Sequence, residues 1–142
     1  MDNVQGFPGT GVASRPYYAG YVNQSAISAG GTNVEAVKLQ LASGFPMKVT
    51  HYRICFFPAL DTDSTFELRD NSNDVSVVQA GTPLGALGVC FVRNAPPDLW
   101  IPLDPMPVMR DGNTWVLKVT NPTVAIPQFQ LGLVLRGQLL YK

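Results

Sequence analysis

The sequence predicts an all-β protein: an antiparallel β-sandwich or jelly roll of seven to eight strands with an extended N-terminal arm. Apolar and polar residues alternate with a period of two through most of the chain after residue 33. Turn-forming residues divide that part into strand-sized segments spaced about 8 to 15 residues apart. No segment shows the 3.6-residue apolar period of an amphipathic helix. Strands without intervening helices form antiparallel sheets, which pack as two layers.

Residues 1–33 are expected to form the arm, and residues 34–142 the sandwich domain. The first segment is rich in Gly, Ser, Asn and Tyr, contains a single acid and a single base, and shows no sustained period. Its aromatic residues distinguish it from a charged disordered tail, so we expect it to lie against a surface of its own subunit or of a neighbour. These aromatic residues are Phe7, Tyr17, Tyr18 and Tyr21.

The first half of the sandwich is expected to contain four strands. Residues 33–41 alternate up to a Ser-Gly turn, and residues 48–57 form a second strand that ends at a proline. Residues 64–69 form a third strand, with Phe66 and Leu68 inward, and an Asx-rich turn joins it to a fourth at 75–78 as a hairpin. In the second strand, alternation places Tyr52, Ile54 and Phe56 on one face and Val49, His51, Arg53 and Cys55 on the other.

The second half begins with a short strand at residues 89–92. The five prolines between residues 94 and 107 leave room for no more than a short edge strand. An Asp-Gly turn at 111–112 then leads into a strand at 114–120.

The last strand, residues 129–142, is expected to be the centre of the fold. Its odd positions are apolar and its even positions mostly polar, beginning with Phe129. Fourteen residues exceed the usual strand length, so we expect a bend at Gly137, where the apolar face lacks a side chain.

Composition favours an assembly subunit. Charged residues make up 14% of the chain, against about 25% in a typical soluble domain, and apolar residues 46%. Either other subunits cover part of the surface, or uncharged polar residues supply it. The ten basic and ten acidic residues are scattered along the chain, which argues against nucleic-acid binding. No apolar run is long enough to span a bilayer, so no membrane partner is expected.

No motif predicts catalysis, a cofactor or a metal. His51 is the single histidine and no nucleophile-elbow sequence is present. The acid-rich turn at 70–74 lacks the glycine and glutamate of a calcium loop, and two cysteines with one histidine cannot form a zinc site. Cys55 and Cys90 are expected to be buried thiols, although a disulfide remains an alternative. Trp100 and the tyrosines at 17, 18 and 21 suit protein anchoring or sugar stacking; alternatively, Trp100 plugs one end of the sandwich.

Four features follow one another between residues 35 and 142: the strand and turn at 66–72, a Gly-rich turn before 88–91, a Pro-containing stretch before 100–103, and the ending at 135–142. This order resembles small β-sandwich virion proteins of tailed bacteriophages, the head-decoration, head-fibre and tail-accessory class. The resemblance implies a non-enzymatic, homo-oligomeric structural protein of the virion, made in the host cytoplasm, whose partners are major capsid or tail proteins.

Two other functions fit the same fold. The main alternative is a carbohydrate-binding or receptor-binding β-sandwich module, which requires an exposed aromatic platform. A hydrolase on a jelly-roll frame would require acids to gather with His51 in a cleft.

Overall fold

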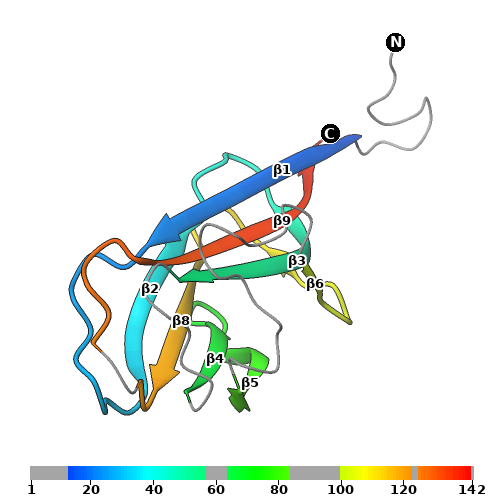
Figure 1. Ribbon diagram of the computed structural model, residues 1–142. Coiled ribbons are helices and arrows are strands. Elements are labelled where there is room, and N and C mark those ends of the chain that lie inside the picture. The colour runs from blue at the N-terminus through cyan, green and yellow to red at the C-terminus, as the bar shows by residue number, and fades with distance from the viewer. Residues whose placement is uncertain (1–12, 57–63, 84–99, 123–124, 142) are drawn as a thin grey trace.

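The computed structural model describes residues 13–56, 64–83, 100–122 and 125–141. Within these residues the chain forms nine strands and no helix, and therefore no helix that could cross a membrane (Figure 1). The strands are β1 (Ala13–Val22), β2 (Val34–Gln40), β3 (Met47–Phe56), β4 (Thr65–Asp70), β5 (Val75–Pro83), β6 (Ile101–Pro102), β7 (Val108–Met109), β8 (Thr114–Thr120) and β9 (Leu131–Tyr141).

The strands form two antiparallel sheets that pack face to face. Sheet I has the order β1-β9-β3-β6, with β7 also paired to β3, and sheet II has the order β2-β8-β4-β5. One long hairpin accounts for most of the strand pairs, because the first half of the chain runs antiparallel to the second half. These pairs are β1–β9, β2–β8, β3 with β6 and β7, and β4–β5. Folding that hairpin over itself adds the pairs β3–β9 and β4–β8. This winding is a jelly roll, so the predicted all-β sandwich is confirmed.

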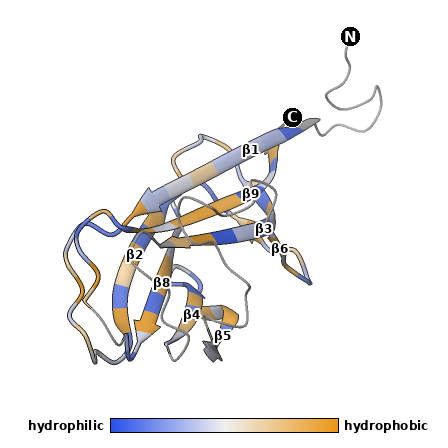
Figure 2. Cartoon of the chain, in the orientation of Figure 1, coloured by the Kyte–Doolittle hydropathy of each residue, from blue (hydrophilic) through white to orange (hydrophobic). Residues whose placement is uncertain are grey.

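The core lies between the sheets, where the apolar side chains of the strands meet. Figure 2 shows hydrophobic residues along strands of both sheets. Strand β9 is central, as expected, because it pairs with β1 on one side and β3 on the other. Its alternate leucines are fully buried, and so is the matching face of β8 in sheet II. These residues are Leu131, Leu133, Leu135 and Leu139 in β9, and Trp115, Leu117 and Val119 in β8.

The start of the last strand differs from the prediction. Strand β9 begins at Leu131, and Phe129 is half-exposed with a φ of 67°. This left-handed conformation belongs to turns, because β-sheet ladders require a negative φ. Phe129 therefore lies in the connection before the strand, and the apolar period shared with the leucines did not distinguish the two.

The prediction that Val49 lies on the opposite face of the strand from Tyr52 and Ile54 is also wrong. Val49 pairs with Gly137 and His51 with Arg136, so Thr50 is an extra residue that forms a β-bulge. The bulge reverses the alternation, which places Val49 in the core together with Tyr52 and Ile54. Phe66 and Leu68 face the core as predicted.

The largest correction concerns the arm. Residues 13–22, which the sequence assigned to an arm at 1–33, form β1 and pair with β9 over all ten residues. They are an edge strand of the sandwich itself, ordered against their own subunit. Phe7, Cys90 and the predicted strand at 89–92 lie outside the described residues.

Candidate protein-interaction site

The predicted interaction residues divide between two surfaces on either side of β1. Tyr17 and Tyr21 pair with Gly137 and Leu133 of β9 and lie on the side of sheet I that faces sheet II. Tyr18 projects from the opposite, outer face, where Trp100 packs against it. Phe7 is outside the described residues.

The first surface is an open groove between β1 and β2. Two adjoining hollows of about 650 and 340 Å³ share Tyr21 and Lys38 in their linings. Tyr17 contributes to the floor and packs against the core, whereas Tyr21 is half-exposed at the rim. We name this surface the β1–β2 groove.

Both walls of the β1–β2 groove are sheet edges. In the described part of the chain, β1 pairs only with β9 and β2 pairs only with β8, so each has one edge without a strand partner. Such an edge presents unpaired backbone N–H and C=O groups that accept an added strand. Pro16, which lacks an N–H donor, reduces this capacity near the beginning of β1.

The second surface is an aromatic and arginine cluster on the outer face of sheet I. The Tyr18 and Trp100 ring centroids are 5.8 Å apart with an interplanar angle of 53°. The Arg136 Cζ atom lies 4.8 Å from the centre of the Trp100 ring, and the Arg53 Cζ atom lies 5.9 Å from it. These are cation–π distances, and Trp, Tyr and Arg are the residues most enriched at interface hot spots.

The sequence prediction missed Arg53 and Arg136. The alternation in β3 places Arg53 on the outward side. Single charges at solvent-facing strand positions are common, however, so one such residue does not indicate a binding site. Only the register across β1, β9 and β3 brings them together, because Tyr18 pairs with Arg136, which in turn pairs with His51.

His51 has a basic environment. Its Nδ1 atom is 2.8 Å from the Thr50 hydroxyl, and partial burial together with the charge of Arg136 lowers its pKa. Across the described residues, no three His, Cys, Asp or Glu side chains gather as a metal site would require. A hydrolase site at His51 would need acidic side chains close to it. The contacts of His51 within the described residues are with Thr50 and Arg136.

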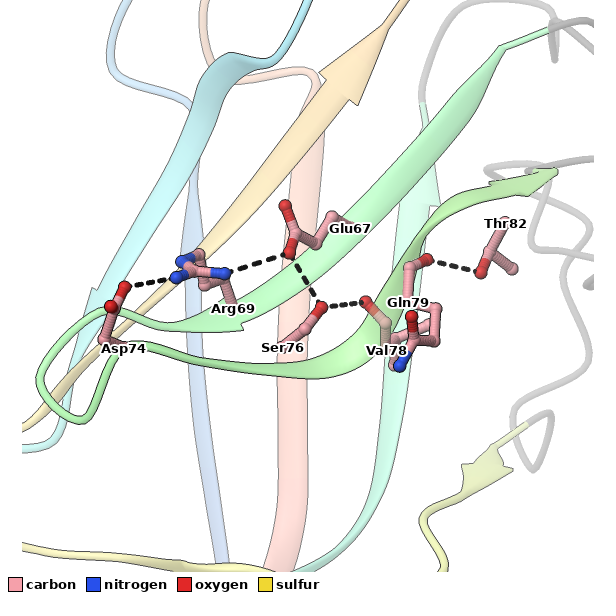
Figure 3. Close-up of polar contacts among 7 residues, drawn as sticks. All are labelled: Glu67, Arg69, Asp74, Ser76, Val78, Gln79 and Thr82. Atoms are coloured by element: carbon pink, nitrogen blue, oxygen red, sulfur yellow. Dashed lines mark hydrogen bonds and ion pairs between the residues drawn. The ribbon is translucent and has the colours of Figure 1, made fainter.

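Charged groups on the outer face of sheet II are paired with one another. In the β4–β5 hairpin, Arg69 contacts both Asp74 and Glu67, and the Ser76 hydroxyl donates to Glu67 over 2.7 Å (Figure 3). Lys38 forms a further ion pair with Glu35, at 3.1 Å. Arg69 and Lys38 are therefore each neutralised by carboxylates of the same sheet.

The acid-rich turn is a structural hairpin turn, as the sequence predicted. The Asp70 carboxylate accepts hydrogen bonds from the backbone N–H groups of Ser72 and Asn73, both at 3.1 Å, and from the Asn73 amide at 2.8 Å. These bonds fix the turn locally, and they occupy the oxygens that a cation would need.

The outer-face cluster is poorly arranged as a sugar platform. A stacked sugar needs an open aromatic face, and the Arg136 guanidinium already lies over the Trp100 ring. Trp100 is also only partly exposed.

No protein-family model matches the chain, and no curated protein or solved structure matches it either.

Proposed function

We propose that the chain is a non-enzymatic structural protein of a virion, which associates with itself through the β1–β2 groove and fastens to a capsid or tail surface. The observation that carries self-association is the groove, because it combines the exposed ring of Tyr21 with two sheet edges that have no strand partner among the described residues. A free edge in a protein with only 14% charged residues invites association with another chain.

The virion assignment rests on two analogies. The jelly roll is an architecture of viral capsid domains, although lectins and cupins also use it. The order of sequence features between residues 35 and 142 resembles small virion proteins of tailed bacteriophages. The small number of charged residues fits both analogies, since neighbouring subunits bury much of the surface of a virion protein.

Light scattering over a range of protein concentrations tests the self-association. We expect the full chain to form a defined oligomer, and Tyr21→Ser to weaken it about tenfold or more, because removal of a central aromatic contact typically costs over 1 kcal/mol. Val75→Ser is the matched control, since Val75 is equally exposed but lies on sheet II, away from the groove.

A full chain that stays monomeric at every concentration would contradict self-association. An oligomer equally weakened by both substitutions would show that the β1–β2 groove is not the contact. Circular dichroism of each variant checks that the sandwich remains folded.

A further inference from the structure

Charge is unequally divided between the two sheets. The strands of sheet I contain no Asp or Glu, but they contain four Lys or Arg residues and the single histidine. The strands of sheet II contain three basic and three acidic residues. A formal charge of zero for the whole chain conceals this difference. The basic residues of sheet I are Arg15, Lys48, Arg53 and Arg136, and the histidine is His51.

The register gathers most of these charges on one face. Lys48 pairs with Gln138, His51 with Arg136, and Arg53 with Val134, and all of these positions alternate with the buried leucines of β9. We name this surface, together with Tyr18 and Trp100, the basic face. It lies on the opposite side of sheet I from the core.

The arginine geometry on the basic face suits carboxylate recognition. A guanidinium stacked on an indole uses its flat face, and its N–H donors remain in the plane, directed outward. The position of Arg136 fits this arrangement, because its Cζ atom lies over the Trp100 ring, 4.8 Å from the ring centre. Stacking orders the side chain without neutralising its charge. On sheet II, by contrast, carboxylates already neutralise Arg69.

We infer that the basic face is a docking surface for an acidic polypeptide segment, whose Asp or Glu carboxylates accept hydrogen bonds from Arg136. Tyr18, with 57% of its surface exposed, provides the adjoining apolar contact. The opposite charges of the basic face and the acidic segment speed their association and make the contact specific. The inference is separate from self-association, because Arg136 lies on the outer side of sheet I, whereas Tyr17 and Tyr21 of the β1–β2 groove lie on its other side.

An acidic polypeptide fits the basic face better than a nucleic acid does. The face has only three permanent cations among the described strands, Lys48, Arg53 and Arg136, whereas single-stranded nucleic acid is held along a positive groove several nucleotides long. Base stacking also requires open aromatic faces, and Arg136 lies over that of Trp100. The carboxylate is therefore the favoured ligand group.

Fluorescence anisotropy of a labelled deca-glutamate peptide with the full chain tests the inference. We expect saturable binding at low ionic strength that weakens as salt is added. Arg136→Gln should reduce the affinity about tenfold, the effect of losing one charge-assisted contact. Lys118→Gln is the matched control, because it removes one positive charge from sheet II away from both surfaces, and it should leave the affinity nearly unchanged.

Several outcomes would overturn the inference. These are failure of the peptide to bind, equal losses for Arg136→Gln and Lys118→Gln, or equal binding of deca-glutamine. Tighter binding of a labelled deca-thymidylate at the same ionic strength would assign the face to nucleic acid instead. If Arg136→Gln does not fold, as judged by circular dichroism, Tyr18→Ser replaces it, and unchanged affinity of that variant would contradict the proposed contact. Loss of peptide binding with the oligomer intact separates this result from the test of self-association.

Discussion

Gly137 occupies a place where the chain has no room for a side chain. A Cβ atom there would lie 1.9 Å from the Lys48 carbonyl oxygen and 3.0 Å from the Val49 Cα atom. Both are backbone atoms at the bulge of β3, so they cannot move aside without disturbing the ladder. We expect Gly137→Ala to lower the free energy of unfolding by about 1 to 3 kcal/mol or more, measured by urea denaturation.

Gly132 provides the matched control on the same strand. An added Cβ would meet its nearest neighbours at 3.7 to 3.9 Å, which is ordinary van der Waals contact. Gly132→Ala should therefore be neutral, or stabilising by about 0.4 to 1 kcal/mol through the unfolded state. Equal destabilisation by the two substitutions would contradict the steric explanation.

His51 predicts a dependence of stability on pH. Burial and Arg136 lower its pKa in the folded protein below the ordinary value of 6.5. Well above pH 6.5, His51 is neutral in both the folded and the unfolded chain, so it does not make stability depend on pH. As pH falls below 6.5, the unfolded chain binds a proton more readily than the folded chain, so the free energy of unfolding decreases.

The variant His51→Gln isolates this effect, because the chain has no other histidine. Between pH 7 and pH 5, the urea midpoint of the unsubstituted protein should fall further than that of His51→Gln. Equal decreases in the two proteins would mean that the environment of His51 does not oppose its charge.

At the scale of the element, β1 shows why edge strands are hard to recognise. Tyr17 and Tyr21 face the sandwich and Tyr18 faces outward, so aromatic residues lie on both sides and hide the period of two. Pro16 and Gly20 further resemble loop residues, although both are tolerated at a sheet edge. The ladder with β9, not the local sequence, makes this segment a strand.

Truncation tests the role of β1. Removal of residues 1–22 would delete the strand and leave β9 as an exposed edge, whereas removal of residues 1–12 keeps every described strand. We expect the longer truncation to be less stable than the shorter one by at least about 3 kcal/mol, through lost hydrogen bonds and the lost packing of Tyr17. Urea denaturation of both proteins measures the difference, and similar midpoints would show that β1 is dispensable.

The bulge in β3 illustrates a second limit of local patterns. Alternation correctly predicts the facing of Tyr52 and Ile54, and it fails for Val49, on the far side of Thr50. The Thr50 hydroxyl donates to the Arg136 carbonyl oxygen at 3.0 Å, a bond between residues far apart in the chain. A bulge depends on such a partner strand, so its position cannot be read from one strand alone.

At the scale of the whole molecule, the jelly-roll winding creates both candidate surfaces. It leaves β1 and β2 as neighbouring edges, which form the walls of the groove. It also places β1, β9 and β3 side by side, although they come from the beginning, end and middle of the sequence. The basic face is the consequence, since its charges lie on separate strands.

The all-β class, most of the strands and the central position of β9 could be predicted from the sequence, because the period-two alternation of apolar residues is a local property of each strand. Two of the predicted aromatic residues, Tyr18 and Trp100, also proved to be in contact. The winding, the bulge, the place of β1 and the gathering of Arg53 and Arg136 became visible in the folded chain alone. These features depend on which strands pair and in what register, and pairing between distant segments leaves no periodic trace in a single chain.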